Sequence, residues 1–356
     1  MISRLFLDEG VALRIVALLL AALMMSACAG SPPSLPKPSL SPDELLARRT
    51  SGLDAANYKD GQFWLNSDKA MRDFVELSTQ YADKDQVPIE LLRALREEWS
   101  RLNYERSANL TASEAFRAQR ANCLSLTEVV ISLMRHAGVR AQFQRVETIT
   151  EWDLDGDSAV GSLHINAVIF IRGRQFEVDW LARRTQDGYE RKFILSDDEA
   201  LAEWHSNIGT EALLRDEYPL AFAELSRALS LAPDAAHIWV NLGVLYRRLG
   251  MNLAAESAWL IALERKPRQL QAMSNLQALF AVSGRQELAA GLNSWIANYR
   301  TRNPFYHYLR AQEAERAGRL SEALRHIRKA KSMHEDARFD ALQARVRDNV
   351  RSSEET

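Results

Sequence analysis

The chain has 356 residues, 45 of them Lys or Arg and 47 Asp or Glu, which gives a formal net charge of −2. A nearly neutral chain offers no electrostatic basis for binding nucleic acid, so no nucleic-acid partner is expected. Because 47% of the residues are hydrophobic, the chain is long and apolar enough to form about two globular domains.

The first residues have the pattern of an export signal. Arg4 and Arg14 lie ahead of an uninterrupted apolar run over residues 15–25. Such a run is too short to cross a bilayer as a helix, but it suits the apolar core of a secretory signal. We therefore expect residues 1–27 to be a cleaved signal peptide.

The signal ends in Met-Ser-Ala-Cys at residues 25–28, which resembles the processing box of bacterial lipoproteins. The resemblance implies cleavage before Cys28 and several acyl chains on that residue, which anchor a protein stably to a membrane. Ala29, rather than Asp, after the cysteine implies the outer membrane, with the protein facing the periplasm. The alternative is an ordinary signal peptide with a chance cysteine.

Residues 28–50 are expected to form a lipidated tether. The stretch 30–42 contains four serines and five prolines, a composition that cannot pack a core. Without the signal, the mature chain would have 356 − 27 = 329 residues.

Residues 51–196 are expected to form a first domain of mixed helices and strands. Apolar residues at helical spacing, a capping box at Thr111-Ala-Ser-Glu114 and the helix-ending Gly138 mark the helices. Helices are expected over 66–81, 88–104, a short stretch after 111, and 123–138. Alternating apolar residues predict strands over 139–148, 163–171 and 175–180, with a turn at 153–157.

Cys123 is the candidate nucleophile of this domain. It lies at the start of a predicted helix, with Asn122 placed to cap that helix. Unpaired N–H groups and the positive end of the helix dipole favour the thiolate there. If Cys28 is acylated, Cys123 has no disulfide partner in the chain, and a free thiol is exposed to oxidation in an oxidising compartment. A buried, inert cysteine is the alternative.

The hairpin predicted after this helix places a histidine and an aspartate close together, as a count of its residues shows. If Arg172-Gly173 is a two-residue turn, paired residue numbers sum to 345, so Asn166 lies opposite Asp179. His164 is then the diagonal neighbour of Asp179 on the same face, within reach of a hydrogen bond. The alternate face, with residues such as Ile165, is apolar and should pack inward.

These residues together resemble the transglutaminase-like superfamily. Four features show the resemblance. They are the helix that begins with Cys123, the sequence Leu-Met-Arg-His-Ala-Gly that leads from this helix into a strand, His164, and Phe-Glu-Val-Asp-Trp over residues 176–180. The resemblance covers roughly residues 110–185. It implies a papain-like core with a Cys-His-Asp triad, in which Cys123 is the nucleophile, His164 the base and Asp179 the group that orients the histidine.

Neither a metal nor a cofactor is expected. The chain has no Gly-rich phosphate loop and no His/Cys spacing typical of zinc sites. Asp153, Asp155 and Asp157 resemble part of a calcium loop, but Gly156 is misplaced and no distal Glu follows, so a solvated hairpin tip is favoured.

Residues 197–338 are expected to form a repeat array. Alanines recur at a spacing of 34 residues, at Ala221, Ala255, Ala289 and Ala323. The unit that begins Trp239-x-x-Leu-Gly-x-x-Tyr246 resembles the tetratricopeptide (TPR) repeat at every signature position, which implies about four pairs of antiparallel helices. A capping box at 196–199 should start the array, and residues 339–356 are expected to be a capping helix and tail.

Asn207, Asn241 and Asn275 share one position of the 34-residue register. In TPR proteins this position faces the concave groove, where an amide can hydrogen-bond an extended peptide through both donor and acceptor. The alternative is that Asn is simply common at that position of the consensus.

The expected fold class is therefore an α+β papain-like, transglutaminase-like domain followed by an all-α TPR solenoid. The first functional hypothesis is a membrane-anchored thiol hydrolase of the cysteine protease or amidase type, whose TPR groove holds a protein or peptide substrate or partner. Transamidation is a less favoured outcome of the same chemistry. The second hypothesis is a TPR adaptor for envelope assembly, in which the transglutaminase-like domain is catalytically silent.

Overall fold

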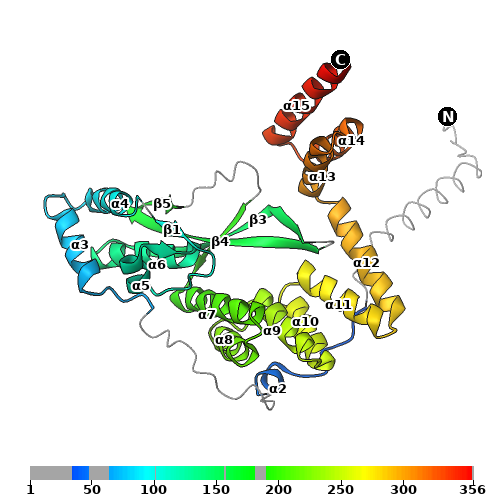
Figure 1. Ribbon diagram of the computed structural model, residues 1–356, viewed down its shortest axis with the longest axis horizontal. Coiled ribbons are helices and arrows are strands. Elements are labelled where there is room, and N and C mark those ends of the chain that lie inside the picture. The colour runs from blue at the N-terminus through cyan, green and yellow to red at the C-terminus, as the bar shows by residue number, and fades with distance from the viewer. Residues whose placement is uncertain (1–33, 48–63, 101, 156–157, 181–189, 355–356) are drawn as a thin grey trace, which may run out of the picture.

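The computed structural model describes residues 34–47, 64–100, 102–155, 158–180 and 190–354. An α+β region is followed by a long stack of helices (Figure 1). This order confirms the expected fold class at the level of an α+β part and an all-helical part. The expected signal peptide over 1–27 and the acylation site Cys28 lie outside the described residues.

Four helices of the α+β region precede the sheet: α3 (Lys69–Thr79), α4 (Val87–Glu98), α5 (Ala112–Ala118) and α6 (Cys123–His136). Each predicted cap is present: Thr111 and Glu114 form the capping box of α5, and the Asn122 side chain accepts from the Ser125 N–H. The predicted helix over 88–104 is too long, because the chain after α4 forms a parallel bridge. There β1 (Asn103–Tyr104) pairs with β2 (Arg120–Ala121).

A four-stranded antiparallel sheet has the order β5-β4-β3-β6. Its strands are β3 (Ala141–Asp155), β4 (Ser158–Ile171), β5 (Arg174–Val178) and β6 (Glu190–Leu195). Arg172 and Gly173 both have positive φ, 50° and 75°, as a two-residue hairpin turn requires. Ile171 pairs with Arg174, so the predicted register is confirmed.

The hairpin of β3 and β4 is longer than predicted. Asp155 pairs with Ser158, so residues 153–155 of the expected turn belong to the strand instead. Asp157 lies outside the described residues. The strand β6 was not predicted. It pairs with the other edge of β3, from Phe143 opposite Leu195 outward.

The core of the α+β region lies between α6 and one face of the sheet. Ile165, Ala167 and Ile169 of β4 are at most 6% exposed, as expected for the apolar face. Phe143 of β3 stacks on Trp64, with ring centroids 5.3 Å apart. This packing fixes the helix that begins with Cys123 against the strand that carries His164.

Nine helices of the described chain build the stack. They are α7 (Asp197–Leu214), α8 (Tyr218–Leu231), α9 (Ala236–Arg248), α10 (Asn252–Arg265), α11 (Leu270–Val282), α12 (Gln286–Thr301), α13 (Pro304–Arg316), α14 (Leu320–Lys331) and α15 (Ala337–Glu354). Close helix pairs depend on two glycines. A Cβ on Gly243 would lie 2.3 Å from Trp259 Nε1, and one on Gly209 would lie 2.9 Å from Leu225 Cγ. The stack thus uses glycine where α9 approaches α10 and where α7 approaches α8.

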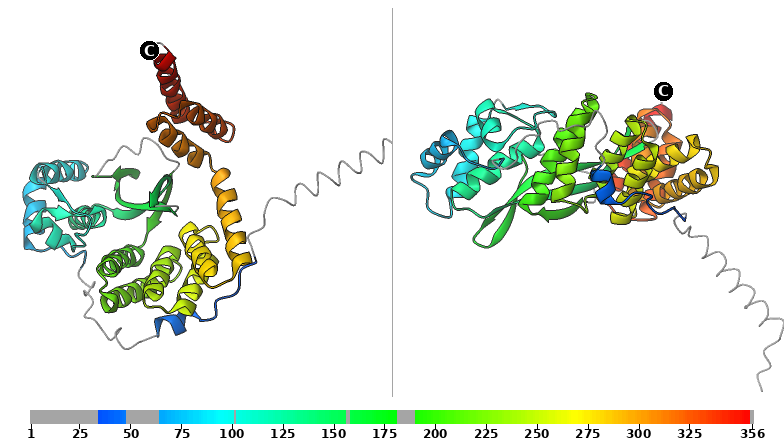
Figure 2. Two further views of the ribbon diagram at one scale, coloured as in Figure 1. Left: turned by 45° about the vertical axis from the view of Figure 1, so that its right-hand side comes forward. Right: turned by 90° about the horizontal axis from the view of Figure 1, so that it is seen from below.

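The stack curves around the sheet (Figure 2). Its helices α7 to α12 share one apolar core, and α13 to α15 have a separate core that includes Phe339. Strand β3 contacts α7 and α13, and β4 contacts α11, so the long hairpin lies inside the curve. Within the described part of the chain, no helix has the length and apolarity needed to cross a membrane.

Helix α7 belongs to both parts of the molecule. Its residues Ala200, Trp204 and Ile208 lie in the core of the α+β region. Ala202 and Ala212 lie in the core of the stack. A helix that is apolar on two sides can only be buried between two partners. The boundary expected at residue 196 therefore divides the sequence but not the packing.

The segment before the first domain is docked, in contrast to the expected free tether. Helix α2 (Pro42–Leu46) lies against the stack, where Leu45 is fully buried and Leu35 and Leu40 are partly buried (Figure 1). Tyr246 Oη donates to the Leu45 carbonyl, and Leu40 N–H donates to Ser257 Oγ at 3.2 Å. The proline and serine content of the segment predicts no packing, but these leucines supply the apolar contact with the stack.

Candidate active site

Cys123 is the first residue of α6, and its thiol is partly exposed. The turn that it opens is held by two neighbouring side chains. Asn122 Nδ2 donates to Asn109 Oδ1 at 2.6 Å, and Ser125 Oγ donates to the Leu110 carbonyl at 2.7 Å. Because these bonds fix the helix start, the cysteine main chain is held in one position relative to the loop before it.

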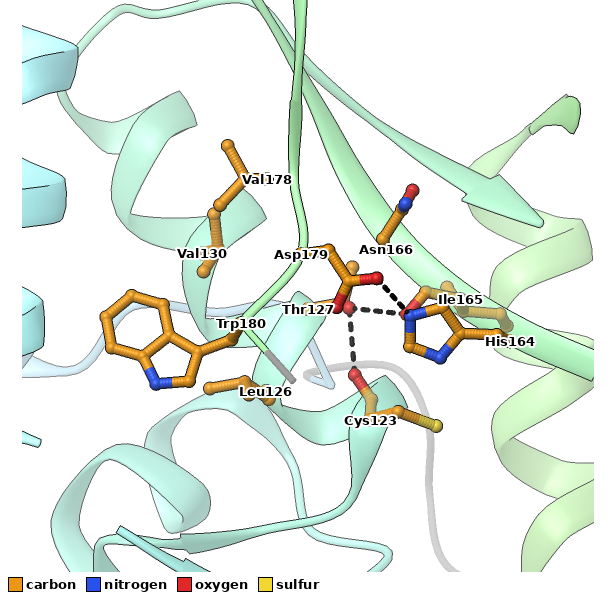
Figure 3. Close-up of a pocket in the computed structure, with 10 residues that line it drawn as sticks. All are labelled: Cys123, Leu126, Thr127, Val130, His164, Ile165, Asn166, Val178, Asp179 and Trp180. Carbon is orange, nitrogen blue, oxygen red and sulfur yellow. Dashed lines mark hydrogen bonds and ion pairs between the residues drawn. The ribbon is translucent and has the colours of Figure 1, made fainter. Parts of the chain in front are cut away.

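His164 and Asp179 form the predicted hydrogen-bonded pair. His164 Nε2 donates to Asp179 Oδ2 at 2.7 Å (Figure 3). Asp179 follows β5 directly, and His164 is its diagonal neighbour on β4, as the register predicts. The thiol of Cys123 lies on the other side of the imidazole from Asp179 (Figure 3). The structure therefore brings the three predicted residues together in one site.

The charge state of His164 follows from these two neighbours. Burial alone would lower the pKa of His164, but hydrogen bonds to Asp179 and Cys123, and the negative charges of both groups, raise it to about 10. At neutral pH the imidazole therefore carries a proton between a carboxylate and a sulfur. This arrangement is typical of thiol nucleophiles that are activated by an adjacent histidine.

A small pocket contains all three residues. Thr127 and Asn166 also line it. Its remaining walls are formed by the apolar side chains of Leu126, Val130, Ile165, Val178 and Trp180 (Figure 3). Thr127 Oγ1 shares its proton between the carbonyl oxygens of Cys123 and Ile165, at 2.8 Å and 3.1 Å. It thereby joins the first turn of α6 to the strand that carries His164.

Sequence reasoning missed Thr127, Ser125 and Asn109. A threonine four residues after Cys123 can be expected to bond back within its own helix. Its second bond, to β4, depends on how the helix packs on the sheet, which no local pattern shows. The contacts of Ser125 and Asn109 likewise join the helix to a loop distant in sequence.

The three asparagines of the repeat register lie on the first helices of successive pairs. Asn207 is on α7, Asn241 on α9 and Asn275 on α11, and each is partly exposed. Asn241 Nδ2 donates to Thr210 Oγ1 on α7 at 3.1 Å. None of the three lines the pocket of Cys123.

A scan against protein-family models gives no match, and a search of curated proteins gives none either. Among the described residues, no three His, Cys, Asp or Glu side chains are grouped so that they could hold a metal ion.

Proposed function

We propose that this protein is a membrane-anchored envelope protein with a thiol hydrolase site of the transglutaminase-like type. The observation that carries the proposal is the placement of His164, which bonds Asp179 at 2.7 Å and faces the Cys123 thiol at a helix N-terminus. The proposed substrate is an amide bond of a protein or peptide, as for a cysteine protease or amidase.

The geometry supports a two-step reaction. The Cys123 sulfur attacks the amide carbon, and the carbonyl oxygen takes up the electron pair. Protonated His164 gives its proton to the leaving nitrogen as the C–N bond breaks, which leaves a thioester and an amine. Neutral His164 then accepts a proton from water, whose oxygen attacks the thioester and releases the acid and the Cys123 thiolate.

The other groups of the site serve this reaction without bonding to the substrate carbon. Asp179 orients the imidazole and stabilises its positive charge. Cys123 is the first helical residue, so no carbonyl of the helix accepts its N–H, which can donate to the developing oxyanion. Water is the proposed acceptor, since it needs no dedicated binding site, whereas transamidation needs a second site for an amine.

The stack is proposed to be a TPR array that binds a protein substrate or partner. Paired helices, the spacing of 34 residues and the glycine contacts at Gly209 and Gly243 support this assignment. The lipid anchor at Cys28 and the outer-membrane location facing the periplasm are part of the same proposal and rest on the lipoprotein box.

Alkylation of Cys123 with iodoacetamide tests the proposal without knowledge of the substrate. At about pH 6 we expect the wild-type protein to react at least tenfold faster than His164→Ala, because the histidine proton stabilises the thiolate. Cys123→Ser gives the background. Equal rates in the wild type and in His164→Ala would refute a thiol hydrolase and leave the catalytically silent adaptor. If the wild-type protein reacts faster, trapping with Cys123→Ala would identify the substrate.

A further inference from the structure

A continuous row of alternating basic and acidic side chains joins the sheet of the proposed site to the stack. From one end, Lys266 bonds Glu147 at 3.2 Å, and Glu147 lies 3.6 Å from Arg145. Arg145 lies 3.5 Å from Glu203, which His237 bonds at 2.9 Å. These side chains are between 10% and 45% exposed, so water screens them only partly.

The row spans four elements that are far apart in sequence. Arg145 and Glu147 belong to β3, and Glu203 belongs to α7. His237 belongs to α9, and Lys266 caps the end of α10. In Figure 2, β3 lies beside the curve of these helices. The contact is therefore one between the sheet and the inner side of the stack.

The row meets β3 at the level of the catalytic histidine. Val146 is the ladder partner of His164, and Arg145 and Glu147 flank Val146 in the strand. Any shift of β3 along or away from the stack would therefore move the strand position directly beside His164. A change of about 1 Å in such a position is enough to alter the reactivity of a catalytic group.

Glu203 is the least exposed residue of the row, at 10%. Burial alone would raise the pKa of Glu203, but His237 and Arg145 hold it below its ordinary value, so the carboxylate is charged at neutral pH. Loss of that charge would leave Arg145 without its partner on α7. Arg145 would then keep only Glu147 of its own strand, so β3 would lose its ionic contact with α7.

We infer that Arg145 and Glu203 are positioning residues of the proposed active site, which fix β3, and through it His164, to the helical stack. The inference rests on the proposed function for its effect on Cys123. Asn207 and Asn241 lie four residues after Glu203 and His237, one helical turn away. A peptide bound along this asparagine row would therefore contact the helices that hold β3.

The test is Glu203→Gln in the full chain, which removes the charge and keeps the shape. Two quantities are measured: the pH midpoint of the His164 ring signals by NMR, and the rate of Cys123 alkylation as a function of pH. We expect the rate to change by about twofold to thirtyfold, the range for mutations that alter coupling between sites. The midpoint of His164 should move with it.

Glu256→Gln is the matched control. Glu256 is 12% exposed, close to the 10% of Glu203, and it bonds Arg285 through both oxygens at 2.7 Å, within the stack. We expect this variant to lower the unfolding temperature without changing the pH midpoint of His164 or the alkylation rate. Equal effects of the two variants on His164 would show a general loss of stability and would overturn the inference.

A second pair of variants keeps the test decisive if Glu203→Gln fails to fold. Arg145→Lys retains the charge and should preserve the pH profile of His164, whereas Arg145→Gln should change it. Identical profiles for the two variants would overturn the inference. If the wild-type thiol proves unreactive but His164 still responds to Arg145 and Glu203, the proposed function fails and the positioning role stands.

Discussion

The pairing of His164 with Asp179 makes a measurable prediction about proton binding. The pKa of His164 is raised from 6.5 to about 10, a difference of 3.5, and Asp179 contributes both a hydrogen bond and a negative charge to that rise. Asp179→Asn keeps the size of the side chain and an oxygen that can accept at Nε2. It removes only the charge, and a neighbouring opposite charge changes the pKa of a titratable group by about one to three.

We therefore expect the ring signals of His164 to titrate near pH 10 in the wild type and at least about one unit lower in Asp179→Asn. The assay is NMR of nitrogen-labelled histidine rings between about pH 5 and 11. The sign follows from the raised pKa: His164 holds its proton through neutral pH and loses it as the pH rises through 10.

Asp85→Asn is a suitable control, because Asp85 bonds Arg172 at the far end of the hairpin and is exposed. It should leave the titration of His164 unchanged. A wild-type midpoint near 6.5 would refute the reasoning, since it would mean that neither Asp179 nor Cys123 holds the proton on the imidazole.

Four further substitutions test the packing of the stack and of the site. Gly243→Ala should lower the free energy of unfolding by about 1–3 kcal/mol in urea denaturation, because its Cβ would overlap the Trp259 ring, and Gly209→Ala should cost less, since the Leu225 side chain can move. Thr127→Val should cost about 1–2 kcal/mol and slow alkylation of Cys123, because it cuts the bond between α6 and β4. Leu45→Ala should cost about 2–5 kcal/mol if the segment before the first domain is docked, and nothing in the same denaturation if it is a free tether.

The hairpin site could be predicted because its geometry is local. A two-residue turn at Arg172-Gly173 and the alternation of side chains fix the register, and the register alone places His164 beside Asp179. The helix start at Cys123 could be predicted for the same reason, since Asn122 caps it from the adjacent position.

The charged row and the docked segment could not be predicted because their partners are distant. Glu203 and His237 are each compatible with an ordinary solvated helix face, and only the approach of β3 gives them a common partner network. Leu35, Leu40 and Leu45 lie five residues apart among prolines, a spacing that matches neither the helix period nor the strand period, so no pattern marks them as buried.

The position of α7 makes the two parts of the molecule one folding problem. Trp204 is fully buried among the side chains that support α6, and its Nε1 donates to the Leu110 carbonyl, the same carbonyl that holds Ser125. Glu203, the preceding residue, points to β3 and α9 instead. One helix therefore supports the start of the cysteine helix on one side and the strand beside His164 on the other. A ligand that shifted α7 would act on both Cys123 and His164, so the proposed binding by the stack and the proposed reactivity of Cys123 would be coupled.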